Sequence, residues 1–183
     1  MHKHLSTPPQ KIFSHIFELT PHDAKRYKEL RLRGLHEHPE AFGELASDFE
    51  QRSVEDIAYQ IDQRSKEGSF ILAASSTEGE LIGCVGLGVS LHGKSAHRGF
   101  VWGMYVLPEA RNQGVAKLLI NKLIERASQL PPLEQIHLNV VTTNTAAARL
   151  YEAVGFSVYG TDPRVLKIDQ NYFDEYLMVL NLR

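Results

Sequence analysis

The chain of 183 residues is 43% hydrophobic, with 13 Gly and 8 Pro, which is the size and apolar content of one compact domain with its own core. Lys and Arg total 20 against 22 for Asp and Glu, a net charge of −2 with neutral histidines, so no positive field favours nucleic acid or an anionic membrane as a partner. Cys84 is the only cysteine, which excludes an intramolecular disulfide, and the chain lacks both a signal-peptide-like segment and a long apolar run, so we expect a cytoplasmic protein that crosses no membrane.

Residues 1–10 are expected to form a flexible tail, and residues 11–183 a single domain. A strand is predicted from Lys11 to Leu19. The segment Thr20-Pro21-His22-Asp23 then offers an N-cap, a proline at N1 and an acid at N3, which predicts a helix into the mid-thirties that ends at Pro39. A second helix, ended by Gly68, is predicted because apolar residues recur on one face, namely Val54, Ile57, Ala58 and Ile61.

The second half of the chain alternates strand-like and helix-like segments. Three meandering antiparallel strands are predicted over residues 70–74, 81–89 and 99–106. A long amphipathic helix follows, because apolar residues recur at helical spacing, namely Ala116, Leu119, Ile120, Leu123, Ile124 and Ala127. A strand (136–141), a helix (146–154) and two strands (156–160 and 172–182) complete the order β-α-α-β-β-β-α-β-α-β-β, which indicates an α/β fold with a mixed sheet.

The densest group of the nine histidines is His36-Glu37-His38. Two histidines two residues apart point to different sides of a helix, whereas a helical zinc pair needs a spacing of four. We therefore expect solvated polar residues there and no metal site.

The stretch from Trp102 to Ala116 indicates chemistry, because a strand ends there in a turn that leads into the long helix. The first turn of a helix leaves backbone N–H groups without partners and carries the positive end of the helix dipole, so it binds polyanions. Gly114 lets the backbone approach a phosphate, while Arg111 and Gln113 add donors. A pyrophosphate is the expected ligand, and an ordinary strand-to-helix turn is the alternative.

In this stretch the sequence resembles the GNAT acyltransferase superfamily. The superfamily signature Q/R-x-x-G-x-G/A, directly after a strand, is filled by Arg111, Gly114 and Ala116. A second superfamily segment, N-x-x-A-x-x-x-Y-E-x-x-G-F, is matched in order and spacing by Asn144, Ala147, Tyr151, Glu152, Gly155 and Phe156. The resemblance is strong over about residues 70–160, whereas the N-terminal part is similar only in its strand-helix-helix layout. It implies a GNAT-like, mostly antiparallel mixed sheet flanked by helices.

The resemblance also implies acetyl-CoA as cosubstrate. The strand before the signature would splay at a bulge and pair its backbone with the pantetheine arm through Met104, Tyr105 and Val106. The pyrophosphate would lie on the following turn and helix start, namely Arg111, Asn112, Gln113, Gly114, Val115, Ala116 and Lys117. Asn144 and Tyr151, seven residues apart with small Ala147 between them, would reach the thiol end of the cofactor.

Tyr151 is the residue that the resemblance implies as catalytic. A phenol with an ordinary pKa of about 10 can give a proton to a departing thiolate, and a tyrosine packed in the core is the alternative. No general base is assigned. Many members of the superfamily use a glutamate on the strand before the signature, but residues 100–106 contain no carboxylate; Glu109, His97 and a chain of waters stay open. Cys84, in an apolar strand, is expected to be inert, so the transfer would be direct.

An acceptor pocket is implied near Pro39-Glu40-Ala41-Phe42-Gly43, where the superfamily builds one wall of it. Phe42 and Glu40 are candidate acceptor contacts, with a capped turn between helices as the alternative. Trp102 is a third candidate, and packing on the sheet is its alternative.

The predicted activity is transfer of an acetyl group to a primary amine of a small molecule or peptide, and a non-catalytic acyl-CoA binding or sensing module is the alternative. The amine itself cannot be read from the sequence. Many relatives in the superfamily pair through their late strands, so residues 176–182 suggest a homodimer; an internal strand is the other interpretation.

Overall fold

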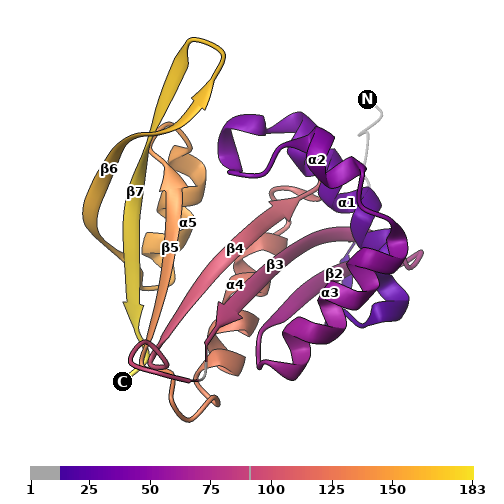
Figure 1. Ribbon diagram of the computed structural model, residues 1–183, viewed down its shortest axis with the longest axis horizontal. Coiled ribbons are helices and arrows are strands. Elements are labelled where there is room, and N and C mark those ends of the chain that lie inside the picture. Colours follow the sequence, from indigo (N-terminus) through magenta and orange to yellow (C-terminus); the bar gives the residue numbers. More distant parts are fainter. Residues whose placement is uncertain (1–12, 91) are drawn as a thin grey trace, which may run out of the picture.

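The computed structural model describes residues 13–90 and 92–183 (Figure 1). The expected flexible tail, 1–10, lies outside the described residues. In chain order the elements are β1 (Phe13–Glu18), a 3₁₀ turn (Pro21–Asp23), α1 (Ala24–Glu37), a 3₁₀ turn (Pro39–Ala41), α2 (Ala46–Glu50), α3 (Val54–Lys66), β2 (Phe70–Ser76), β3 (Leu81–Val89), β4 (Arg98–Val106), a 3₁₀ turn (Pro108–Ala110), α4 (Val115–Ala127), β5 (Gln135–Val141), α5 (Thr145–Ala153), β6 (Ser157–Ile168) and β7 (Asn171–Asn181).

This order confirms the predicted fold class, and two details differ from the prediction. The short helix α2 was not predicted, because five residues are too few to show a helical repeat. Strand β6 continues eight residues beyond its predicted end at Gly160, to Ile168. Pro163 lies within a break in the β6–β7 register between Asp162 and Leu166, so its missing N–H costs no ladder bond.

The seven strands form one sheet in the order β1-β2-β3-β4-β5-β7-β6. All neighbours are antiparallel except β4 and β5, which are parallel and pair at only three positions: Arg98–Gln135, Gly99–Ile136 and Phe100–His137. Beyond Phe100 the two strands diverge, as Figure 1 shows. The β5 side of β4 therefore has no strand partner over its last six residues.

Strand β4 carries a bulge just where it leaves β5. Cys84 of β3 lies opposite Tyr105 and Gly86 lies opposite Trp102, so one residue of β3 faces two residues of β4, Gly103 and Met104. Gly103 has a φ of 66°, in the left-handed region that glycine adopts without strain. A bulge of this kind bends a strand and redirects its side chains.

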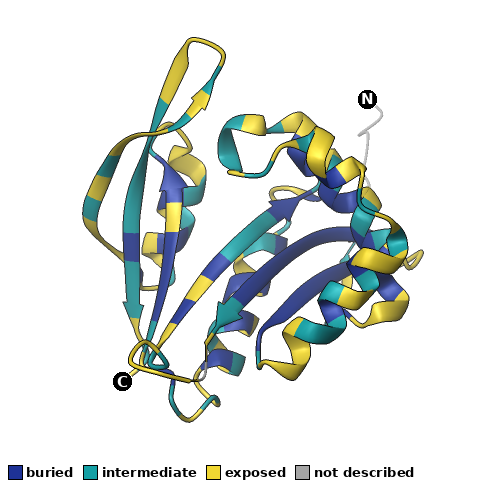
Figure 2. Cartoon of the chain, viewed as in Figure 1, coloured by how far each residue is buried: buried dark blue, intermediate teal, exposed yellow. Residues whose placement is uncertain are grey.

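Helices cover both faces of the sheet. Helices α4 and α5 lie behind it in Figure 1, and α1, α2 and α3 cover β2 and β3 in front. Alternate residues of β2 serve the two layers: Phe70 and Leu72 pack with α4, whereas Ile71 and Ala73 pack with α1 and α3. The front of β4 and β5 has no such cover, and Figure 2 shows exposed stretches along both strands. Phe100 of β4 and Asn139 of β5 are exposed residues.

Trp102 lies on this front face, flat against β3. A Cβ added at Gly86 would lie 2.3 Å from Trp102 Cε2 and 2.5 Å from Cζ2, distances that real Cβ atoms do not show. Two residues further along the same strand, a Cβ at Gly88 would meet its nearest atoms at 3.8 Å, an ordinary contact. Gly86 therefore makes room for the indole.

We expect Gly86→Ala to destabilise the fold, because the added methyl group forces the indole or the strand to move. Overpacking of this kind costs about 1–3 kcal/mol of unfolding free energy, which urea denaturation would measure. Gly88→Ala is the matched control and should be neutral or slightly stabilising. Equal stability of the two variants would show that Trp102 does not pack on Gly86.

Candidate active site

A hollow of about 430 Å³ opens where β4 and β5 diverge. Its walls come from the end of α1, the last residues of β4, the turn after β4, the start of α4 and the N-terminal half of α5. The lining residues are His38, Ala41, Phe42, Met104, Tyr105, Val106, Ala110, Arg111, Asn112, Gly114, Val115, Ala116, Lys117, Asn144, Ala146, Ala147, Leu150 and Tyr151. All the predicted cofactor residues except Gln113 are among them. The volume lies within the range of small-molecule sites.

The start of α4 presents free backbone donors to this hollow. Gly114 is the N-cap, and the first backbone bond of the helix runs from the Leu118 N–H to the Gly114 carbonyl at 3.0 Å. The N–H groups of the three residues between them therefore have no partner within the helix. Gly114 has a φ of 78°, and a Cβ built there would meet nothing within 4 Å. Glycine is thus required for its backbone angle, and the space in front of it is open.

Arg111 and Gln113 are partly committed to the protein. The Arg111 Nε donates to the Val106 carbonyl at 3.0 Å, and its Nη2 lies 3.1 Å from His38 Nε2. Gln113 donates through Nε2 to the Glu109 carbonyl at 3.3 Å and does not line the hollow. Arg111 and Gln113, which were predicted to bind the pyrophosphate, therefore also stabilise the turn itself through these hydrogen bonds.

Tyr105 directs its side chain away from the open edge of β4. Its hydroxyl donates to Glu37 Oε2 at 2.6 Å, and burial together with this carboxylate raises the pKa of the phenol. The same bond, with help from Arg33, lowers the pKa of Glu37. Any contribution of Tyr105 to a cofactor site therefore rests on its backbone and on the ring edge that borders the hollow.

The N-terminal half of α5 forms the opposite wall. Asn144 is the N-cap, and its Oδ1 accepts from the Ala147 N–H at 3.1 Å. The Tyr151 ring is 6% exposed and packs edge-on against Phe156 with ring centres 5.9 Å apart. Burial raises the pKa of Tyr151, and among the described residues nothing accepts a hydrogen bond from its hydroxyl. This phenol is a neutral donor without a protein partner.

A second, smaller hollow of about 90 Å³ adjoins the first. It is lined by Ala41, Phe42, Val101, Trp102, Gly103, Met104, Leu138, Asn139, Val140, Val141, Asn144, Ala147 and Tyr151. The two hollows meet beside Tyr151, since six residues line both of them: Ala41, Phe42, Met104, Asn144, Ala147 and Tyr151. The smaller hollow also reaches Trp102 and Asn139 on the front of the sheet.

The three candidate acceptor residues have different places in this arrangement. Phe42 lines both hollows, and Trp102 lines the smaller one. Glu40 lines neither, and its Oε1 lies 3.3 Å from His38 Nδ1. The structure therefore brings Phe42 and Trp102 together and leaves Glu40 on the outside of the turn.

Glu109, one of the bases left open, is engaged elsewhere. Its two oxygens accept from Arg33 Nη1 and Nη2 at 2.8 and 2.9 Å, and this pairing lowers the pKa of the carboxyl group. Glu109 lines neither hollow. Arg33 also binds Glu37 at 2.8 Å, so it joins the end of α1 to the turn before α4.

Sequence reasoning missed two polar residues of the site. His38 follows α1 directly and lines the larger hollow, although the sequence analysis treated it only as a solvated residue. Asn139 stands exposed between buried Leu138 and Val140 on β5 and lines the smaller hollow. One polar residue within an apolar strand was the available signal for Asn139.

Residues 13–90 and 92–183 contain no group of three or more His, Cys, Asp or Glu side chains placed to hold a metal ion. Within the same ranges, no helix has the length and apolar character needed to span a bilayer.

The sequence profile of the acetyltransferase (GNAT) family matches residues 33–156. The L-amino acid N-acetyltransferase AaaT of Escherichia coli is 24% identical over 147 residues, which are 80% of this chain and 88% of that protein. The L-methionine sulfoximine/L-methionine sulfone acetyltransferase of Pseudomonas paraeruginosa is 31% identical over 122 residues, 66% of this chain and 70% of the relative.

A solved structure has the same fold. It is yncA of Salmonella typhimurium, a putative acetyltransferase with its cofactor acetyl-CoA, which aligns with a TM-score of 0.81 at 19% identity over 93% of this chain and 94% of its own. The fold agreement thus extends beyond the segment that the family profile matches.

Cys84 is buried beneath the site, and burial raises the pKa of its thiol to about 11. At pH 8 only about one thiol in a thousand would be ionised, so we expect no alkylation of the native protein by iodoacetamide within minutes. The same reagent should modify Cys84 fully in urea, which is the control. Rapid native alkylation, measured by mass spectrometry, would show that the thiol is accessible and ionised.

Proposed function

The chain belongs to the GNAT family of N-acetyltransferases, and on this premise we propose that it transfers the acetyl group of acetyl-CoA directly to a primary amine of a small molecule or peptide. Family membership favours this enzyme over the non-catalytic acyl-CoA binding module. The names of two relatives put amino acids and amino acid analogues among the candidate acceptors.

The observation that carries the proposal is the position of Tyr151 in the wall of both hollows. The larger hollow has free helix amides at one end, as an anionic cofactor needs, and the smaller one opens to the front of the sheet. A group at their junction can contact the thioester from one side while the acceptor enters from the other. Direct transfer requires that both substrates meet beside one proton donor, and the position of Tyr151 would allow this.

The residues around the larger hollow suit acetyl-CoA. The amides of Val115, Ala116 and Lys117, with the Lys117 side chain, would hold the pyrophosphate. The open edge of β4 at Met104 would pair with the amides of the pantetheine arm, as an added strand does. Acetyl-CoA supplies an acyl group on a thiol leaving group.

Tyr151 would then act as the proton donor. As the acceptor nitrogen bonds to the acyl carbon and the carbon–sulfur bond breaks, negative charge gathers on the sulfur, and the Tyr151 phenol gives that sulfur a proton. Burial keeps the phenol protonated until this moment. The structure offers no carboxylate on β4 beyond Phe100, so we propose that the acceptor loses its own proton to water in the open groove.

We further propose a single domain and a cytoplasmic location. One sheet holds all seven strands, which supports a single domain over residues 11–183. A cytoplasmic location agrees with the composition. For the homodimer, residues 176–182 give no support, because β7 lies inside the sheet between β5 and β6, and the sheet ends at β1 and β6.

Gly114→Glu should abolish binding of acetyl-CoA, because it adds a negative charge and a side chain where the pyrophosphate would lie. Gly93→Glu is the matched control, since Gly93 has a φ of 79° and equally open surroundings but lies in the loop before β4. Isothermal titration calorimetry should detect acetyl-CoA binding to the control alone. Undiminished binding to a folded Gly114→Glu variant would contradict the proposed phosphate site.

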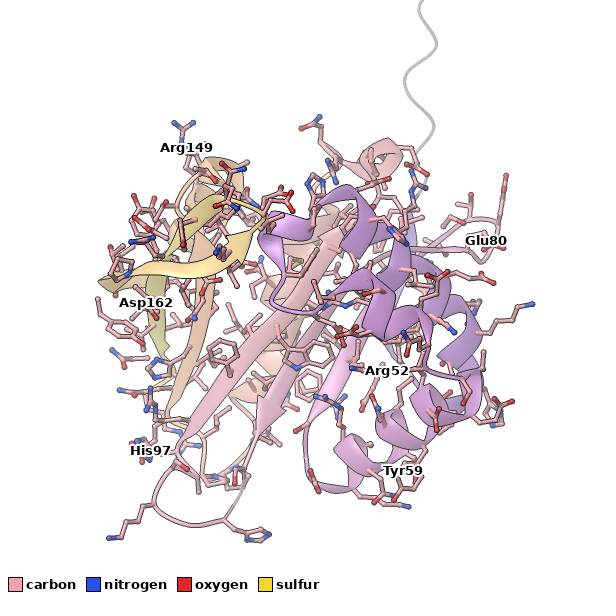
Figure 3. All side chains as sticks on the ribbon, turned by 45° about the horizontal axis from the view of Figure 1, so that its top comes forward. Arg52, Tyr59, Glu80, His97, Arg149 and Asp162 are labelled. Atoms are coloured by element: carbon pink, nitrogen blue, oxygen red, sulfur yellow. The ribbon has the colours of Figure 1, made fainter. Side chains whose placement is uncertain are left out.

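Tyr151→Phe should lower kcat by roughly 10²–10⁴-fold with little change in the Kd of acetyl-CoA, because it removes only the proton donor. Tyr59→Phe, at an exposed position on α3 labelled in Figure 3, is the control and should have wild-type kinetics. Thiol release under conditions where chemistry limits the rate is the measurement. Full activity of Tyr151→Phe across the pH range would return Tyr151 to a packing role.

A further inference from the structure

The front of the sheet holds three adjoining hollows that all border Trp102. The first, of about 90 Å³, contains Tyr151 and Asn139. The second, of about 110 Å³, lies toward α2 and α3 and contains Glu44, Arg52 and Arg64, and the third, of about 590 Å³, lies toward the start of β4. An acceptor whose amine reaches the Tyr151 end would extend along Trp102 into the other two.

The helical side of this region carries an excess of positive charge. Arg64 of α3 stacks on the Trp102 ring, with Cζ 4.8 Å from the ring centre, and makes no ion pair with any described carboxylate. Arg31 of α1 and Arg52 share the single carboxylate of Glu44, at 3.3 and 2.6 Å. Three guanidinium groups thus face one acid.

The unmet hydrogen-bonding capacity on this side consists only of donors. The Trp102 indole N–H and the Nε and Nη1 groups of Arg31 are buried, and among the described atoms they have no acceptor. Arg31 is 5% exposed and lies against the Phe42 ring, with Cζ 4.4 Å from the ring centre. Since buried polar groups are nearly always paired in native proteins, these donors indicate a ligand or water that brings acceptor oxygens.

The opposite side of the region is acidic. Glu175 of β7 and Asp162 of β6 are cross-strand partners, both half-buried, and no described cation lies within ion-pair distance of either. The Asn139 amide, which lines the hollow beside Tyr151, donates to Glu175 Oε2 at 2.9 Å. Figure 3 shows Arg52 on the helical side and Asp162 on the β6–β7 side, with β4 and β5 between them.

Positive groups therefore flank the hollows on the helical side and acidic groups flank them on the β6–β7 side, and we call the three hollows together the polarised groove. The inference drawn from it rests on the proposed function. We propose that the acceptor is a free amino acid, or a small amine that likewise carries a carboxylate, bound with its carboxylate toward Arg64 and the Trp102 indole and its amino group toward Tyr151 and Asn139, whose amide is held by Glu175. A diamine or polyamine would place a second cation against the arginines. An alkylamine without a carboxylate would leave the buried donors unpaired.

The hollow beside Tyr151 measures only about 90 Å³, which favours a free amino acid over a longer peptide. The β6–β7 hairpin also reaches the turn after α1, where a Cβ built at Gly43 would lie 4.0 Å from Leu166 Cδ2. In the reaction the amide C–N bond forms and the thioester C–S bond breaks. Of the two protons that the ammonium loses, one replaces the proton that Tyr151 gives to the departing thiolate and one is released to solvent, while the carboxylate is unchanged.

The test compares acceptors that differ only in the carboxylate. The wild-type enzyme is assayed by thiol release with acetyl-CoA and each of the twenty standard L-amino acids, and the best substrate is then compared with its amide and with its decarboxylated amine. We expect kcat/KM to fall by about 10²-fold or more for both analogues, because a site built for an anion rejects a ligand that lacks it.

Arg64→Gln should lower kcat/KM for the amino acid by roughly 10–10²-fold, mainly through KM, and leave the decarboxylated amine unaffected. Arg64→Lys should recover part of the loss, which a merely structural role of the guanidinium would not predict. Lys66→Gln, on the same helix but paired with Asp62 at 2.5 Å, is the control for net charge. Calorimetric binding of acetyl-CoA verifies that each variant is folded.

Two results would overturn this inference, and they differ in what they say of the proposed function. If amines without a carboxylate are acetylated as well as amino acids, and Arg64→Gln treats both alike, the enzyme is an acetyltransferase but the polarised groove does not select its acceptor. If no amine of either kind releases thiol from acetyl-CoA, the proposed function itself fails, and this inference fails with it.

Discussion

The parting of β4 and β5 is the constraint on which the rest of the site depends. Parallel strands side by side normally pair along their length, yet these two share only three residue pairs. The bulge at Gly103 and Met104 then turns β4 away, and the gap so formed is lined by strand edges and helix N-termini in place of a packed core. A backbone edge without a partner is costly to bury unless something pairs with it, so this edge suits a ligand with amides of its own.

Trp102 organises the other side of the parting. Because Gly86 and Gly88 leave no side chains beneath it, the indole lies flat on β3 and forms a wall for three hollows. The arginines stack on it or gather beside it, whereas the acids lie across the sheet on β6 and β7. The positive groups thus lie on the helical side of Trp102 and the acidic groups lie on β6 and β7. The width of β4 and β5 sets the distance between the two groups.

Most of the fold, and most of the residues that line the larger hollow, could be predicted from the sequence. Strands and helices with clear hydrophobic periodicity were predicted within a few residues, and the turn into the helix that begins at Val115 was predicted from local chemistry. The directions of side chains and the contacts between elements distant in the chain could not be predicted from the sequence. Nothing local shows that Arg111 lies beside His38, that Glu109 pairs with Arg33, or that Arg31 is buried without acceptors, because each depends on elements distant in the chain. Asn139 and Glu175 meet only because β5 and β7 are neighbours.

The end of α1 is held by three contacts to β4 and to the turn that follows it: Glu37 with Tyr105 of β4, and Arg33 with Glu109 and His38 with Arg111 in the turn. The chain then runs directly from His38 into Phe42, which borders the groove for the acceptor. The same junction thus borders both proposed binding sites. If acetyl-CoA orders this junction, the amine binds more tightly, and thermodynamic reciprocity requires the amine to favour acetyl-CoA by the same factor. The contacts at the end of α1 would in this way link the affinity for one substrate to the affinity for the other.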